Sequence, residues 1–436
     1  MNTYKLYTSL MVLFLTIVLS CNSYQKNKNN KITHKEDYEN YLQINTNKVL
    51  SKIEDDIDFW TKKYKNAPNQ LTYLIKLSGL YSQQFDITGN IDDLYTAEKM
   101  LLDCNNRLKG TNASIQRSIA KNYISQHRFK EALKHLQQAF VLGENKKGTL
   151  KMLFDVHMEL GNYKKAKKLL TDIQDFKDFD YLIRLAKWND HIGNLDDAIN
   201  VMEKAMVMVE ESNNKYLKTW IYSNIADFYG HAGRINDSYE YYLKTLALDA
   251  NNMYALKGIA WIAFSHERNV GEALEILSYI EVKHPVPDIY LLKAEINEYA
   301  ENQQAKQHAL NSYFTELEKN NYGEMYNSYN ALLFAETPGD MRKALQIAKR
   351  EIENRPTANS YDLLAWTYYN MGEFEDAYAI AKKYTLNKSH EPLIVYHNQL
   401  ILKANNKLSQ ENSKKRDLVE SIFELGPNFE NQIKSL

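Results

Sequence analysis

The chain has 436 residues, of which 44% are hydrophobic and 25% are charged, a balance typical of a folded globular protein. Its 54 lysines and arginines nearly match its 55 aspartates and glutamates, and the formal net charge of -1 argues against nucleic acid as a partner. Only 15 glycines and 7 prolines serve the whole length, too few for the turns of a β-sandwich or barrel, so the composition favours an all-α fold.

Residues 1–20 have the parts of a secretory signal: a start that carries Lys5, an apolar run from Leu10 to Leu19, and a small residue before Cys21. The run is about half as long as a membrane-spanning helix needs to be. Val18-Leu19-Ser20-Cys21 resembles the lipobox of bacterial lipoproteins. The resemblance implies cleavage before Cys21 and a palmitate-type lipid on that cysteine; a plain secretory peptide or an uncleaved anchor is the alternative.

The next segment, residues 21–35, is rich in Asn and Lys and is expected to form a flexible tether. In such lipoproteins, an Asp directly after the acylated cysteine is similar to a signal that retains the protein in the inner membrane. This chain has Asn22 at that position. The resemblance therefore implies a cell-envelope location at the outer membrane, and the lack of early acidic residues favours its periplasmic face.

Residues 36–70 are expected to form an N-terminal capping helix region that covers the first repeat of the following array. Apolar residues at helical spacing indicate one amphipathic helix or two, and they are Tyr41, Leu42, Val49, Ile53, Ile57 and Trp60. Cys104 has no partner within the chain if Cys21 is acylated, so no disulfide is expected. A buried inert thiol is favoured over a reactive or metal-binding one.

From Leu71 onward the chain repeats a two-helix pattern with a small residue in each helix and a turn between them. Ala132, Ala166 and Ala198 open successive second helices, 34 and then 32 residues apart. The turn glycines Gly161, Gly193, Gly233 and Gly372 each lie five residues before such a position, where a helix end needs the left-handed conformation.

This period resembles that of the tetratricopeptide repeat. The resemblance implies a right-handed superhelical solenoid of about ten helix pairs over residues 71–428, with residues 429–436 as a C-terminal tail. The repeats are expected to begin near Leu71, Ala113, Lys147, Phe179, Thr219, Met253, Pro287, Met325, Ala358 and Pro392.

Catalytic motifs are absent from the sequence. It has no phosphate-binding loop, no dinucleotide glycine motif, no Gly-x-Ser-x-Gly elbow and no His-Glu-x-x-His. Acidic pairs such as Asp92-Asp93 and Asp196-Asp197 precede or open second helices, where carboxylates offset the helix dipole. We therefore expect no enzyme activity, no cofactor and no metal site.

The remaining candidate for a functional site is the concave surface. In the tetratricopeptide family, this surface is lined by the first helix of each repeat. Carried over by position, the candidate partner-binding residues are Trp220, Tyr254, Lys257, Trp261, Phe264, Trp366 and Tyr369. Aromatic side chains are enriched among binding hot spots, although packing between repeats would explain the same residues. The resemblance implies a membrane-anchored adaptor that binds a protein or peptide of the envelope; the alternative is a carbohydrate-binding outer-membrane lipoprotein.

Overall fold

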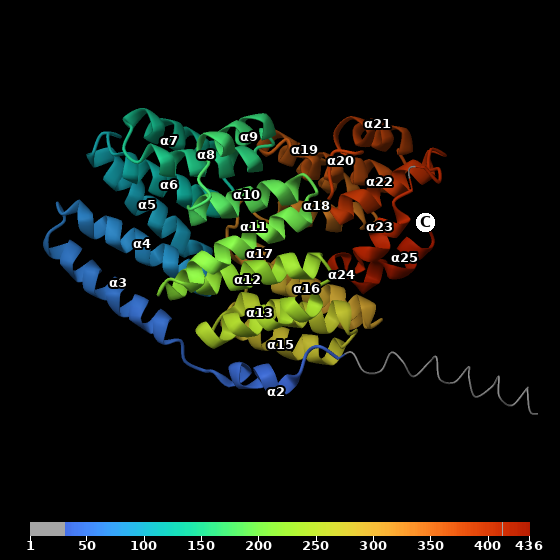
Figure 1. Cartoon of the computed structure of the whole chain (residues 1–436), viewed down its shortest axis with the longest axis horizontal. Coiled ribbons are helices and arrows are strands. Elements are labelled where there is room, and N and C mark those ends of the chain that lie inside the picture. Colours follow the sequence, from blue (N-terminus) through green and yellow to red (C-terminus); the bar gives the residue numbers. More distant parts are fainter. Residues whose placement is uncertain (1–30, 412) are drawn as a thin grey trace, which may run out of the picture.

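The computed structural model describes residues 31–411 and 413–436, and all regular secondary structure in these ranges is helical. Figure 1 shows the helices stacked side by side in chain order along a curved array. The expected signal peptide, Cys21 and most of the expected tether lie outside the described residues. Within the described ranges, no helix has both the length and the apolar character needed to cross a membrane.

The helices pair with their neighbours in sequence, and each pair is joined by a short turn. The pairs are α4 (Leu71–Thr88) with α5 (Ile91–Arg107), α6 (Ala113–Ser125) with α7 (Phe129–Leu142), α8 (Lys146–Glu159) with α9 (Tyr163–Asp172), α10 (Phe179–His191) with α11 (Leu195–Glu210), α12 (Lys215–His231) with α13 (Ile235–Leu248), α14 (Met253–Trp261) with α15 (Val270–Lys283), α16 (Pro287–Tyr299) with α17 (Gln303–Lys319), α18 (Asn327–Ala335) with α19 (Met341–Asn354), and α20 (Ala358–Asn370) with α21 (Phe374–Tyr384). α22 (Pro392–Ala404) packs against the short C-terminal helices α23 (Lys415–Glu420), α24 (Ile422–Leu425) and α25 (Glu430–Lys434). This arrangement confirms the expected all-α repeat solenoid.

The expected repeat starts agree closely with the observed helices. Leu71, Ala113, Phe179, Met253, Pro287, Ala358 and Pro392 are the first residues of α4, α6, α10, α14, α16, α20 and α22. The others differ by a few residues: α8 begins at Lys146, α12 at Lys215 and α18 at Asn327.

Local chemistry explains where the helices begin and end. Asparagine recurs just before a helix, as at Asn112, Asn214 and Asn252, where its side-chain oxygen accepts a hydrogen bond from a free backbone amide of the first turn. The predicted turn glycines adopt the left-handed conformation, with φ of 67° at Gly161 and 81° at Gly372. The small residues of the repeat are fully buried, as expected for helices that cross in close contact; they include Ala120, Ala132, Ala186, Ala198, Ala260, Ala273 and Ala365.

The array curves until its later repeats contact the turns of its earlier ones. His284 Nδ1 lies 3.0 Å from the carbonyl oxygen of Ile87, 197 residues away along the chain. Gly161 lies against Pro356 and Gly193 lies against His390, and each pair has nearly the same separation along the chain as His284 and Ile87. Tyr95 also donates a hydrogen bond to the carbonyl of Asn321. One superhelical turn therefore takes about six repeats, and the second turn packs on the edge of the first.

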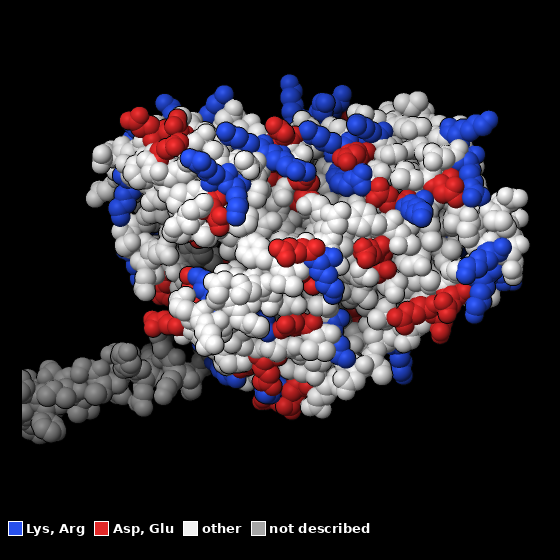
Figure 2. Space-filling view, turned by 180° about the vertical axis from the view of Figure 1, so that it is seen from behind, with Lys and Arg blue, Asp and Glu red and all other residues white. Residues whose placement is uncertain are grey.

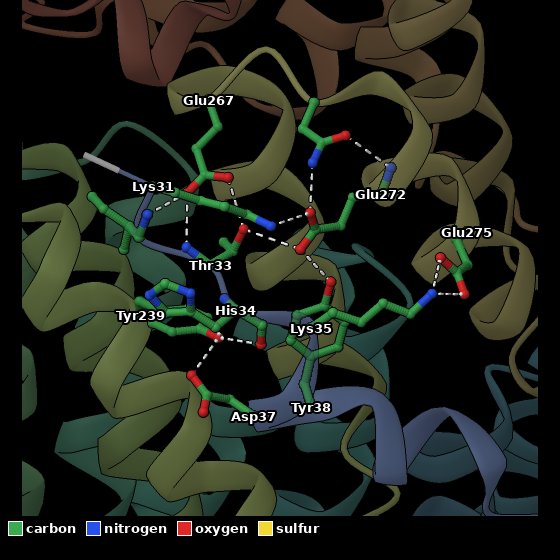
Figure 3. A network of polar contacts seen from close by, with 12 residues as sticks. Lys31, Thr33, His34, Lys35, Asp37, Tyr38, Tyr239, Glu267, Glu272 and Glu275 are labelled. Carbon is green, nitrogen blue, oxygen red and sulfur yellow. Dashed lines mark hydrogen bonds and ion pairs between the residues drawn. The ribbon is translucent and has the colours of Figure 1, made fainter. Parts of the chain in front are cut away.

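The N-terminal segment, residues 31–46, lies along the middle of the array rather than on the first repeat; we call it the strap (Figure 3). The Glu267 carboxylate accepts hydrogen bonds from the backbone amides of Ile32 and Thr33, at 2.5 and 2.7 Å, and from the Thr33 hydroxyl at 2.8 Å. Tyr239 accepts a hydrogen bond from the His34 amide at 3.0 Å. Tyr38 is buried and donates to Glu272.

Two expectations are corrected by this placement. Residues 31–35 are held by hydrogen bonds, whereas they were expected to belong to a flexible tether. Within residues 36–70, Tyr41 and Leu42 pack on the core of α13 to α16, and only α3 (Lys48–Asn66) covers the first pair. Sequence periodicity could not separate these parts, because the contacts of the strap join residues more than 200 positions apart.

The C-terminal end is also folded. Residues 429–436 were expected to be a tail, but they include α25, whose Ile433 is fully buried with Tyr396 and Leu418. α24 packs against α12 and against the π-helical turn η2 (Ile262–His266) that ends α14. The C-terminal helices therefore contact the middle of the array as well as its last repeat.

Candidate binding cavity

A recess of about 530 Å³ lies on the inner side of the array, and we call it the inner cavity. Most of its lining comes from first helices of successive repeats, α12, α14, α16 and α18, and the second helices α13 and α17 also contribute. Its lining residues are Asp227, Tyr242, Tyr254, Lys257, Gly258, Trp261, Asp288, Leu291, Leu292, Ala294, Glu295, Glu298, Lys306, Leu310, Tyr329, Leu332, Leu333 and Glu336. The volume falls in the range of about 300–1,000 Å³ that is usual for ligand sites.

Both lysines of the cavity are paired with carboxylates. Lys257 Nζ lies 2.9 Å from Asp288 Oδ2, and Lys306 Nζ lies 2.6 Å from Glu298 Oε1. Burial would lower the pKa of Lys257 and raise that of Asp288, but their mutual attraction outweighs burial and shifts each pKa the opposite way. Lys257 is therefore held charged by Asp288.

Asp227 is bound by two tyrosine hydroxyls. Tyr254 Oη donates to Asp227 Oδ2 at 2.5 Å, and Tyr242 donates to Oδ1 of the same carboxylate. Burial raises the pKa of Asp227 above its usual range despite these two hydrogen bonds. Gly258 is required in this corner, because a side chain there would collide with the ring of Tyr242.

Glu295 differs from the other acidic residues of the cavity. Within the described chain its carboxylate accepts no hydrogen bond and makes no ion pair, while its own backbone carbonyl accepts one from Asn428 at 3.0 Å. Burial, together with the nearby charge of Glu298, raises the pKa of Glu295 to about 8. The side chain is recessed, lying against Gly426 and beside Trp261.

Two tyrosines present large exposed surfaces to the cavity. The side chains of Tyr254 and Tyr329 are 49% and 48% exposed, which is unusual for aromatic residues in so recessed a position. Leu310 and Leu333 are half-buried beside them. The cavity therefore combines accessible apolar surface with carboxylates.

The C-terminal segment packs against Trp261, which is a residue of the cavity wall. The carbonyl oxygen of Phe423 accepts hydrogen bonds from Trp261 Nε1 at 3.0 Å and from Ser265 Oγ at 2.6 Å. The Phe423 ring packs edge-on against Trp261, and Arg268 pairs with Glu430 at 3.1 Å. The chain itself thus occupies part of the surface that the first helices present.

The structure brings only some of the candidate partner-binding residues together in the cavity. Tyr254, Lys257 and Trp261 lie together in the cavity wall. Phe264 is fully buried in the core, packed edge-on against Tyr299, so it does not reach the concave surface. Its expected position assumed a regular helix, but α14 ends in a π-helical turn that begins at Ile262, and the wider turn changes the direction of the following side chains.

The remaining three candidates lie outside the cavity. Trp366 is only 6% exposed; it stacks on His397 and donates from Nε1 to Glu336 at 3.1 Å. Tyr369 is half-buried and stacks on Trp366. Trp220 is half-buried against Phe179 in the core of α8 to α12. The structure gives these three rings packing partners inside the chain.

Charged residues of the earlier first helices also pair with each other. Lys151 contacts Asp178 at 2.8 Å, Arg184 contacts Asp155 at 2.5 Å and Lys187 contacts Glu159 at 2.9 Å. Each pair joins one repeat to the next, so these charges contribute to the contacts between repeats. Figure 2 shows further lysines and arginines gathered along one outer edge, and α9 contributes the exposed Lys164, Lys165, Lys167 and Lys168.

Metal-binding and reactive cysteine sites are a further possibility for chemistry in this chain. No cluster of three or more His, Cys, Asp or Glu residues in residues 31–411 and 413–436 could hold a metal ion. Cys104 is fully buried, and burial raises the pKa of its thiol to about 11, so it is an unreactive core residue.

Glu295, Leu310, Tyr329 and Leu333 were missed at the level of sequence. The seventh repeat lacks a clear turn glycine, and Glu301 adopts the left-handed conformation in its place, with φ of 56°. The aromatic and leucine spacing after Met325 was the available signal.

Comparisons with known proteins agree with the helix pairs. Residues 357–383, which form α20 and most of α21, match the family model of the tetratricopeptide repeat. No curated protein matches the chain in sequence.

Several solved structures resemble the fold loosely. Human IFIT1 bound to Gppp-AAAA, as a monomeric mutant, has a TM-score of 0.46 at 14% identity, over 75% of this chain and 76% of that one. Yeast Tom70 has a TM-score of 0.37 at 13% identity, over 87% and 98%. A tetratricopeptide repeat protein from Parabacteroides merdae has a TM-score of 0.34 at 15% identity, over 66% and 98%.

Proposed function

We propose that this chain is a non-catalytic scaffold that holds a protein or peptide segment in the inner cavity. The observation that carries the proposal is the pair Tyr254 and Tyr329, each about half exposed inside a recess. Aromatic rings in such positions offer a large contact area at a low entropic cost, and they are enriched among binding hot spots. Helical repeats of this type generally act by presenting a surface.

The chemistry of the cavity favours a peptide over a nucleic acid. Its lining has more carboxylates than lysines, and both lysines are paired. A phosphate backbone needs unpaired cations, so it would be repelled from this surface.

The test is capture of a partner from a cell-envelope extract by the full chain. Wild-type protein and the control Tyr216→Ala, which removes an aromatic ring that is 71% exposed outside the cavity, should retain the same partner. The double variant Tyr254→Ala, Tyr329→Ala should lose it. Equal capture by all three proteins would move the binding surface away from the cavity.

We also propose that a lipid on Cys21 anchors the scaffold to the outer membrane, on its periplasmic face. The support is the motif at residues 18–21 and Asn22 after it. Cys21→Ala should abolish labelling by a palmitate analogue and move the protein from the membrane fraction to the soluble envelope fraction. A variant that still pellets with membranes would contradict the anchor, and digestion of the wild type by protease added to intact cells would contradict the periplasmic face.

A further inference from the structure

The acidic residues of the inner cavity outnumber its basic residues. Asp227, Asp288, Glu295, Glu298 and Glu336 face two lysines, Lys257 and Lys306. The lysines neutralise Asp288 and Glu298 through the ion pairs described above. Three carboxylates therefore remain without a cation.

These three differ in how far the chain already satisfies them. Asp227 accepts hydrogen bonds from Tyr242 and Tyr254, and Glu336 accepts one from Trp366. The Glu295 carboxylate accepts none from the described chain, although it lies in the cavity wall against Gly426. A carboxylate in a cavity wall that has no partner within the chain can accept a charge-assisted hydrogen bond from a ligand that supplies a cation.

The surroundings of Glu295 define the rest of such a ligand. Leu291, Leu310 and Leu333 line the cavity with it, and Tyr329 and Trp261 add aromatic faces. An aliphatic stem ending in a cation matches this arrangement, because the stem buries apolar area and the head reaches the carboxylate. Aromatic faces also attract cations.

We propose that the inner cavity is a receptor for a lysine or arginine side chain carried on an apolar peptide segment, with Glu295 as the counterion. The inference rests on the proposed function and specifies the chemistry of the partner. Asp227 and Glu336 supply the surrounding negative potential, and Tyr254 and Tyr329 contact the flanking apolar residues.

The experiment uses three capped peptides that differ at one position: Ac-Leu-Lys-Leu-NH2, its norleucine counterpart and its glutamate counterpart. Binding to the full chain is measured by titration calorimetry at low ionic strength and at a pH of about 9, where Glu295 is ionised and a lysine side chain keeps its charge. The lysine peptide should bind at least about tenfold more tightly than the norleucine peptide, because only the lysine can donate a charged hydrogen bond to the carboxylate. The glutamate peptide should bind most weakly.

Glu295→Gln tests the counterion directly, since it keeps the shape of the side chain and removes its charge. The variant should bind the lysine peptide only as well as the norleucine peptide, and its affinity for the norleucine peptide should not change. The matched control is Glu318→Gln on the exposed face of α17, which should retain the lysine preference. Circular dichroism verifies that each variant is folded.

Other results would overturn the inference. Equal affinity for the three peptides, no binding of any peptide, or a lysine preference that survives in Glu295→Gln would each exclude Glu295 as the counterion. Hexylammonium binding as tightly as the lysine peptide would show that the cavity takes a small amine and not a peptide. If a partner is still captured through Tyr254 and Tyr329 in those cases, the scaffold function stands and only the cationic ligand is excluded.

Discussion

Gly372 and Gly161 occupy the same place in two repeats, yet the structure gives them different surroundings. Both have positive φ, of 81° and 67°. A β-carbon added at Gly372 would meet no atom within 4 Å, whereas one at Gly161 would lie 2.7 Å from the carbonyl oxygen of Pro356. Gly372 serves only the loop between its two helices, whereas Gly161 also allows the second superhelical turn to pack on the first.

We expect Gly372→Ala to lower the free energy of unfolding by about 1 kcal/mol, the cost of a left-handed non-glycine residue. Gly161→Ala should cost roughly 1–3 kcal/mol more, because it adds a collision between the two superhelical turns. Urea denaturation of both variants measures the difference. Equal losses would mean that the contact with Pro356 gives way without cost.

The raised pKa of Glu295 predicts a pH dependence of stability. A glutamate in the unfolded chain has a pKa of about 4.3, and in the folded chain that of Glu295 is about 8. Between these values the folded state holds a proton that the unfolded state has released, so this contribution to stability is present at low pH and is lost as pH rises to 8. The charged groups that share the cavity with Glu295 are Asp227, Lys257, Asp288, Glu298, Lys306 and Glu336.

Glutamine at position 295 does not titrate, so the melting temperature of Glu295→Gln relative to wild type should increase from pH 5 to pH 9. Thermal unfolding at several pH values in one buffer series checks the sign. Glu318→Gln, whose carboxylate is on the exposed face of α17, should show no such trend. A constant difference for Glu295→Gln would indicate an ordinary pKa.

At the scale of elements, the strap depends on a few buried polar contacts. Glu267 accepts three hydrogen bonds from Ile32 and Thr33, and Thr33 is fully buried. Lys35 and Glu275 form an ion pair whose side chains are each about half exposed. Buried contacts of the first kind are costly to break, whereas exposed ion pairs contribute little.

Glu267→Ala should therefore release the strap, with faster hydrogen exchange over residues 31–46 and unchanged exchange in α4 to α9. Glu275→Ala is the matched control and should leave exchange in the strap within a factor of a few of wild type. Hydrogen exchange followed by mass spectrometry resolves the segments. The same rates in the two variants would show that apolar contacts such as that of Tyr38 hold the strap alone.

The helices and turns could be predicted because their signals are local. Gly372 and Ala132 act within one repeat, where glycine ends a helix and alanine allows close packing. The placement of Phe264 was wrong because one π-helical turn changes the side-chain directions. The strap and Glu295 could not be predicted, since their environments are made by residues from other parts of the chain, such as Glu267 for Thr33 and Gly426 for Glu295.

At the scale of the whole molecule, the closed superhelix differs from an open repeat array. In an open array each repeat contacts only its neighbours, so segments can unfold separately. This chain adds contacts between residues about 197 positions apart, such as His284 with Ile87, and the C-terminal segment bonds to Trp261. These contacts couple distant repeats.

We expect a single cooperative unfolding transition in urea. The five tryptophans lie in α3, α10, α12, α14 and α20, so their fluorescence reports on most of the array. Its midpoint should coincide with that of far-UV circular dichroism. Two separated midpoints would mean that the contacts between superhelical turns are too weak to couple them.

The strap also decides where mechanical force enters the molecule. A pull on the chain ahead of residue 31 acts first on the hydrogen bonds to Glu267 and Tyr239, in the middle of the array. While those bonds hold, α3 and α4 carry no load, although they follow the strap in sequence. The cavity lies among α12 to α18, next to the helices that carry this load. Tension on the N-terminal side would therefore act on the cavity before it reached the first repeat.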